Sequence, residues 1–423
     1  MNALDIDKLR AHVERLPSAG LDAIRQQAVA TLARSGLPST RDENFKYTDL
    51  SEIGALSRAW LERPTKADVS PETAQRIADV TAQAGIDWLV IANGDLDAAL
   101  AHSVPGVSLE RLSESPPELA ALQPLTALNA ALLEDGLVIR VSADPERPLG
   151  LLVIDDASAA PGLSQLRVDI EVAAGQSLEL VEYYLSTGDE AHYSNAVLRL
   201  DLEEGGSARH VRIQDRGLGH SQTQRLDVAL ARDAAFESAS FDLGGRLTRN
   251  DLNVDLAAPD SRAEFAGLYL SGDGQHVDNH TLVDHRTGPT VSRQEYRGIL
   301  FGRSRAVWNG KAMVHEGADG TDAEQANHNL LLSENAEIDT KPELEIYAED
   351  VRCAHGTTVG QLDERALFYL RSRGLDADDA RRLLVHAFAT QILTATPVDA
   401  MKPHLEALLD AKLATINDVA PFI

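Results

Sequence analysis

The middle of the chain alternates apolar and polar residues over many short segments. Alternation with a period of two residues is typical of strands that bury one face. The pattern recurs from about residue 136 to residue 351, and no amphipathic helix interrupts it. The strands it predicts are 137–141, 166–172, 177–181, 196–202, 208–213, 225–230, 251–256 and 264–270. Because no strict repeat period is visible, a sandwich, a barrel and a stacked β-helix all remain open on the pattern alone.

Both ends of the chain show helical spacing instead. Near the start, Leu9, Val13 and Leu16 recur at helical intervals, and a second helix is expected from residue 20 to residue 32. A mixed region follows, with a buried strand at 88–92 and a helix over 119–133. Helices return over 361–372, over 377–393 with Asp376 as N-cap, and around 404–409. We therefore expect an N-terminal helical or mixed domain (1–135), a β core (136–355) and a C-terminal helical domain (356–423).

Charge narrows the classes of partner. The chain has 39 Lys and Arg against 66 Asp and Glu, a net charge of −27, which repels nucleic-acid phosphate and anionic lipid. No apolar run approaches the roughly 20 residues that span a bilayer. The first residues lack a secretory pattern, so we expect a cytoplasmic protein with no nucleic-acid or membrane partner. A nucleotide phosphate loop of the G-x-x-x-x-G-K-[ST] type is also missing from the sequence.

The single cysteine, Cys353, lies two residues before His355. One cysteine cannot form an intramolecular disulfide or supply a four-thiolate metal site. A regular strand through 344–355 would direct Leu344, Ile346 and Ala348 to the core and turn Cys353 and His355 outward together. A thiolate and an imidazole on one surface suit iron or zinc. The alternative is a packed thiol beside a hydrogen-bonded histidine.

A second set of potential metal ligands follows the same spacing. His276, Asp278 and His280 would share one face of a strand, and His285 follows closely. Histidine and carboxylate sets bind divalent metals, although polar faces of β domains also carry such residues without metal.

Several linked motifs resemble the SufB/SufD family of the SUF iron–sulfur cluster assembly system. The motifs are the segments 353–374, 292–298, 321–333, 338–346 and, near the start, 41–48. Within that family the chain resembles the SufD type of subunit more than the SufB type, because it is short and has one cysteine.

The resemblance implies a fold and a set of partners. The fold is a mostly β protein, a right-handed parallel β-helix flanked by N-terminal and C-terminal helical domains. The complex contains one SufB, one SufD and two SufC ATPases, so this chain is expected to be a scaffold and not an enzyme. SufB pairs with the β-helix, and SufC docks on the C-terminal helices. The residues expected to dock SufC are Gln361, Leu367, Phe368, Leu370, Arg373 and Gly374.

The same resemblance implies the site. His355 is expected to be a metal ligand of a nascent iron–sulfur cluster shared with SufB, next to Cys353, with no cluster held stably by the isolated chain. Reduced flavin in the complex and a homodimer of the isolated chain are left open. Two alternatives remain: a purely architectural subunit, and a β-helix or cupin-like metalloenzyme using His276, Asp278, His280 and His285. For Glu43, Lys46 and Tyr47, a buried ion pair is the simplest expectation.

Overall fold

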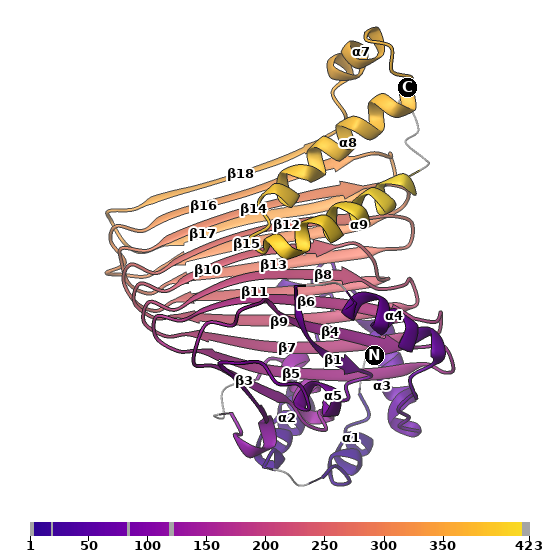
Figure 1. The fold of residues 1–423 in the computed structure, drawn as a ribbon, viewed down its shortest axis with the longest axis vertical. Coiled ribbons are helices and arrows are strands. Elements are labelled where there is room, and N and C mark those ends of the chain that lie inside the picture. The colour runs from indigo at the N-terminus through magenta and orange to yellow at the C-terminus, as the bar shows by residue number, and fades with distance from the viewer. Residues whose placement is uncertain (1–3, 18–19, 83–84, 118–121, 417–423) are drawn as a thin grey trace.

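The computed structural model describes residues 4–17, 20–82, 85–117 and 122–416. In this part of the chain two nine-stranded sheets face each other, and from residue 137 on successive strands alternate between them (Figure 1). Sheet A contains β1 (Asp87–Ala92), β4 (Leu149–Asp156), β6 (Ser177–Thr187), β8 (Ser207–Asp215), β10 (Ala235–Asp242), β12 (Arg262–Ser271), β14 (Val291–Leu300), β16 (Asp322–Leu331) and β18 (Arg352–Gly360). Sheet B contains β2 (Val107–Arg111), β3 (Leu137–Val141), β5 (Gly162–Val172), β7 (His192–Leu202), β9 (His220–Leu230), β11 (Leu247–Leu256), β13 (His276–His285), β15 (Arg305–Val314) and β17 (Glu337–Ile346). The predicted parallel β-solenoid with helices at both ends is confirmed.

The register explains why the sequence shows no strict period. From β3 on, each strand pairs in parallel with the strand two further along the chain, which lies one turn of the solenoid away; β1 instead pairs with β4, and β2 pairs antiparallel with β3. Ala235 pairs with Arg262, 27 residues on, whereas Val291 pairs with Asp322, 31 residues on. The connecting turns absorb this difference in length, so the side chains stack regularly while the sequence intervals vary.

Apolar side chains fill much of the solenoid interior, and the N-terminal helices lie at the end opposite β18 (Figure 1). The N-terminal elements are α1 (Ile6–Val13), α2 (Asp22–Ser35), η1 (Glu43–Phe45), α3 (Ser51–Glu62), α4 (Pro71–Thr81), α5 (Asp97–Leu100), η2 (Leu112–Glu114) and α6 (Pro124–Leu132). Of the helix expected over 119–133, residues 119–121 lie outside the described residues. The predicted strand at 88–92 is β1, which joins sheet A beside β4.

The C-terminal helices are α7 (Glu364–Ser372), α8 (Ala377–Thr394), η3 (Asp399–Met401) and α9 (Lys402–Ala414). The predicted cap is present: the Asp376 side chain accepts a hydrogen bond from the Asp379 amide at 2.8 Å. Gly374 has a φ of 102°, a left-handed conformation that glycine adopts readily between two helices. Helices α8 and α9 lie across sheet A, whereas α7 stands clear of the solenoid (Figure 1). Strand β18 runs to Gly360, beyond residue 355, where the sequence predicts the end of the β core.

No helix among the described residues is long and apolar enough to cross a membrane.

Candidate functional site

The solenoid has an open end at β17 and β18. These are the last strands of sheets B and A, so one hydrogen-bonding edge of each has no neighbouring strand within the described residues. Large apolar side chains lie at this end and are exposed: Ile346 by 40%, Tyr347 by 63% and Val359 by 50%. Unpaired strand edges next to exposed apolar groups favour association with another chain.

The single strand predicted over 344–355 is wrong. Strand β17 ends at Ile346, and β18 begins at Arg352 in the opposite sheet. Residues 347–351 carry the chain across: the Tyr347 amide still bonds to Val314 in sheet B, whereas the Arg352 amide bonds to Thr321 next to sheet A. Because the chain changes sheet between Ile346 and Arg352, the alternation of side chains along β17 does not continue into β18. The side on which Cys353 and His355 lie must therefore be taken from the pairing of β18 with β16.

Cys353 and His355 share a face, as predicted, but they face the solenoid interior and not outward. Cys353 pairs with Ala323 and His355 pairs with Gln325, and both of these neighbours in β16 are buried inside the solenoid. In-register residues of parallel strands point to the same side of the sheet. Among the described residues, no further turn of the solenoid covers β18, so Cys353 is half-buried and His355 is exposed at the mouth of the solenoid.

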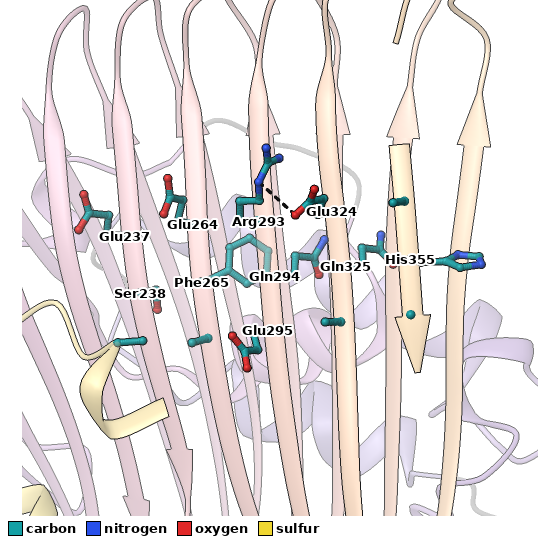
Figure 2. Close-up of a pocket in the computed structure, with 15 residues that line it drawn as sticks. Glu237, Ser238, Glu264, Phe265, Arg293, Gln294, Glu295, Glu324, Gln325 and His355 are labelled. Carbon is teal, nitrogen blue, oxygen red and sulfur yellow. Dashed lines mark ion pairs between the residues drawn. The ribbon is translucent and has the colours of Figure 1, made fainter. Parts of the chain in front are cut away.

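The two side chains differ in chemical state. Burial raises the pKa of the Cys353 thiol, and the nearby Asp322 carboxylate raises it further, so the thiol is protonated at neutral pH. His355 makes no hydrogen bond or ion pair with any described residue, and its ring extends from the last strand away from the acidic side chains (Figure 2). An exposed imidazole without a partner is available as a ligand to a group that approaches the open end.

His276, Asp278 and His280 lie on one outward face of β13, as the spacing predicts. Their contacts are with the protein itself. The Thr48 hydroxyl donates to Asp278 Oδ2 at 2.5 Å, and it lies 2.9 Å from His276 Nε2. Arg249 Nη1 donates to the same carboxylate oxygen at 2.5 Å.

His285 lies on the opposite, interior face of β13. Its two ring nitrogens contact the hydroxyl oxygens of Thr290 and Ser292 at 2.8 and 3.0 Å. The structure therefore does not bring His285 to the other three candidate ligands. In the described ranges, no group of three or more His, Cys, Asp or Glu side chains is placed to hold a metal ion.

Charge governs this outward cluster on sheet B. Burial alone would raise the pKa of Asp278, but the Arg249 guanidinium and His280 together hold it well below its usual range. Arg249 also donates to the Asn44 carbonyl at 2.8 Å, and its guanidinium lies 4.5 Å above the Phe45 ring. The cluster thus anchors the segment Glu43–Thr48 to the solenoid.

The buried ion pair expected among Glu43, Lys46 and Tyr47 is not present. Glu43 is exposed and pairs with Lys341 of β17 at 2.9 Å. The Lys46 amine lies 5.2 Å from the centre of the Tyr47 ring, and the Arg305 guanidinium lies 5.7 Å from the same ring centre. These residues therefore link the N-terminal segment to the strands nearest the open end.

The C-terminal hairpin, α7 with α8, exposes a second apolar surface. Phe368 is 74% exposed, Tyr369 55% and Leu383 46%. Leu367 and Leu370 are half-buried, and Gln361, Arg373 and Gly374 are exposed. Among the described residues, six of the eight exposed large apolar side chains fall between Ile346 and Leu383. The open end and the hairpin therefore form a continuous region of the chain with unburied apolar surface.

Two family models match the chain. Residues 153–388 match the SufBD core domain of SUF system FeS cluster assembly, and residues 6–74 match the SufBD protein N-terminal region. The core match covers more than half of the chain. The chain belongs to the SufBD family.

Curated relatives of this SufBD protein agree. The iron–sulfur cluster assembly protein SufD of Escherichia coli is 30% identical over 397 residues, covering 92% of each chain. A SufBD family iron–sulfur cluster assembly protein of Synechocystis is 29% identical over 415 residues, covering 92% of this chain and 90% of its own. The chloroplastic protein ABCI7 of Arabidopsis thaliana is 27% identical over 417 residues, covering 93% and 87%. The chain is thus a SufD-type homologue that functions in iron–sulfur cluster assembly.

Sequence reasoning missed two features of this SufBD protein. One is the anchor of Thr48 on Asp278, because these residues are 230 positions apart and nothing local links them. The other is the exposure of Ile346 and Val359. A signal for the second was available at Val359, which follows the polar and glycine run 355–358 and precedes Gly360.

Proposed function

We propose that this chain is a scaffold subunit that pairs through the open end of its solenoid with a SufB-type subunit. In this proposal it docks the ATPase SufC on the α7–α8 hairpin. It also contributes His355, with Cys353 beside it, to a nascent cluster at the subunit boundary. The single observation that carries the proposal is the position of His355 on the last strand of the solenoid, where no described residue pairs with its ring or covers the strand edge.

The donor chemistry supports a shared site. An iron atom in a cluster takes about four ligands, counting bridging sulfides, and imidazole can replace thiolate on iron. One imidazole and one thiol from this chain fill only part of that shell, so a second subunit has to supply the remaining ligands. The raised pKa of Cys353 makes this thiol a weak ligand until iron displaces its proton, which favours His355 as the first contact.

The hairpin supports ATPase docking. Phe368 and Tyr369 extend into solvent from α7, which buries none of its residues. A helix with no buried side chain gains little stability from this chain alone, and a partner that covers its apolar residues would supply the missing packing.

The contacts of α8 offer a route from the ATPase to the site. The Arg297 guanidinium of β14 lies 4.9 Å above the Phe388 ring of α8. On the same face, His328 Nδ1 of β16 contacts the Thr358 hydroxyl of β18 at 2.9 Å. A shift of α8 driven by ATP hydrolysis in the partner would therefore act on sheet A, whose last strand, β18, carries His355.

The ligand role is tested by the substitution His355→Ala in the purified three-component complex. We expect the complex to assemble normally and the yield of iron and acid-labile sulfide to fall at least tenfold. His102→Ala, at an exposed histidine far from the open end in sequence, is the matched control and should keep the wild-type yield. An unchanged yield with His355→Ala would support the alternative of a purely architectural subunit, in which His355 has no chemical role.

Docking is tested by Phe368→Asp. The substitution places a charge on the exposed apolar surface of α7 and should abolish co-purification of SufC while the SufB-type subunit is retained. Leu218→Asp is the control, because Leu218 is 59% exposed on a turn of the solenoid. Retention of SufC by the Phe368→Asp chain would refute this docking site.

The cytoplasmic location stays a prediction.

A further inference from the structure

A groove of about 470 Å³ lies on the outer face of sheet A, between the last residues of α8 and strand β18. Its floor is a row of four outward-facing positions on neighbouring strands, three of which are alanine or glycine. Ala266, Glu295, Ala326 and Gly356 occupy successive register positions on β12, β14, β16 and β18. Only Glu295 in this row has a long side chain, so the floor leaves room for another chain to lie across the strands.

Acidic side chains form one wall of the groove. Glu237, Glu264, Arg293 and Glu324 are register neighbours on β10, β12, β14 and β16. Figure 2 shows the four side chains in one row, on the same side of the sheet. Neighbouring strands are about 4.8 Å apart, so Glu237 and Glu264 place two like charges next to each other.

An arginine flanks each end of the Glu237–Glu264 pair, but each of these arginines pairs with another acidic residue: Arg209 of β8, the register neighbour of Glu237, pairs with Glu179. Arg293 donates to Asp322 at 2.8 Å and forms a longer ion pair with Glu324 at 3.5 Å. Within the part of the chain that the structure describes, Glu237 and Glu264 form no hydrogen bond or ion pair. Like charges at opposing strand positions destabilise a sheet, so this row is less stable than one with a cation between the two carboxylates.

The outer face of sheet B also carries ion pairs between neighbouring strands, as sheet A does with the Arg209–Glu179 and Arg293–Asp322 pairs. On sheet B, Arg305 pairs with Asp339 at 2.9 Å, and Lys311 pairs with Glu345 at 2.7 Å, each across neighbouring strands. Among the described residues, the adjacent carboxylates of Glu237 and Glu264 lack such an ion pair, and this local feature of the groove does not follow simply from the net charge of −27.

We propose that the groove is a second contact surface for the subunit that pairs at the open end, and that it receives a lysine- or arginine-bearing segment of that subunit. The inference rests on the proposed function for the pairing itself. Two observations select this occupant. Its cations would neutralise Glu237 and Glu264, and the floor of the groove continues to Gly356 on β18, whose far edge is free. A segment of the partner that passes over this edge would reach the Gly356 end of the groove first.

The test compares two chains with the same loss of charge. The double substitution Glu237→Gln/Glu264→Gln removes the two unpaired carboxylates and keeps the shape of the groove. The matched control is Asp189→Asn/Glu190→Gln, at exposed acidic positions of the turn between β6 and β7. The dissociation constant for the purified SufB-type subunit is measured for both chains and the wild type in 50 mM and 300 mM salt.

We expect the groove variant to bind about tenfold more weakly than wild type in low salt, because two ion pairs to the partner are lost. The difference should be smaller in high salt, because salt screens ion pairs at these solvent-accessible carboxylates. The control should bind like wild type. Without the partner, the groove variant should have a higher Tm than wild type, because removing adjacent like charges relieves their repulsion. The thermal measurement also shows that the variant folds.

Three results would overturn the inference. Equal affinity of the groove variant and the wild type for the SufB-type subunit would refute the groove contact while leaving the pairing intact. A loss of affinity for SufC alone would assign the groove to the ATPase instead. If even the wild type failed to bind the SufB-type subunit, the proposed function would fail together with this inference.

Discussion

The anchor between Thr48 and Asp278 leads to a prediction that separates its structural role from a metal-binding role. Asp278 is 1% exposed and Thr48 is fully buried, so neither group can exchange its partner for water. The carboxylate accepts from the Thr48 hydroxyl and from Arg249, each at 2.5 Å. The substitution Asp278→Asn removes the negative charge and leaves the surrounding packing nearly unchanged.

The expected magnitude follows from these contacts. Removing one partner of a buried ion pair typically costs about 3–5 kcal/mol, because the other charge stays buried. Arg249 keeps a second carboxylate, Asp251 at 2.7 Å, so we expect about 3 kcal/mol for Asp278→Asn. Thr48→Val removes one hydrogen bond to a charged acceptor and should cost about 2 kcal/mol. Because the two substitutions remove the same contact, the double variant should lose less than the sum.

Urea denaturation at pH 7 measures these free energies of unfolding. Hydrogen exchange at the amides of residues 44–48 reports whether the segment is released, and exchange should quicken in both variants. Wild type is also measured with added Zn²⁺ and with a chelator, and its midpoint should not change. A midpoint that rises with Zn²⁺, falls with the chelator and loses both responses in Asp278→Asn would refute the anchor and support a metal site.

Three further predictions concern buried groups. Burial lowers the pKa of His220 to about 3, so as the pH falls the unfolded state takes up a proton on this residue before the folded state does. The free energy of unfolding should therefore fall by about 2 kcal/mol from pH 7 to pH 5. His220→Gln should remove this part of the pH dependence, and an unchanged pH dependence of the unfolding free energy in urea titrations would contradict the prediction. Arg25 is fully buried and donates to three backbone carbonyls, so Arg25→Leu should cost about 3 kcal/mol or more in urea denaturation, and a loss below 1 kcal/mol would refute this role. A Cβ on Gly298 would lie 2.2 Å from the Tyr269 ring, so Gly298→Ala should lower the Tm by the equivalent of about 2 kcal/mol. Gly356→Ala is the control, because its added carbon meets nothing within 4 Å. Equal changes in Tm for the two variants would contradict the packing argument.

Local patterns in the sequence were sufficient for most of the elements. The predicted strand 137–141 is β3, and the predicted segments 166–172 and 196–202 lie within β5 and β7. Alternation and helix capping are set by neighbouring residues, so they can be recognised without knowing what each element packs against. For the same reason the sequence could place His276 and Asp278 on one face of a strand.

The candidate site was predicted less completely. The sequence identified Cys353 and His355 and put them on one face, and family resemblance supplied their expected role. It did not show that the chain crosses between sheets after Ile346, because a turn of the solenoid and a continued strand have similar local composition. It therefore assigned the wrong side to both residues.

The sequence by itself determined the strands, the helix caps, the single cysteine and the excess of acidic residues, because each depends on residue type and short-range spacing. The tertiary structure alone decided which sheet each strand joins, that Cys353 and His355 face the mouth of the solenoid, and that Asp278 holds Thr48. These features depend on pairings between residues about 30 or more positions apart. Such pairings form where the stacked strands bring distant side chains together, and the short-range pattern carries no record of them.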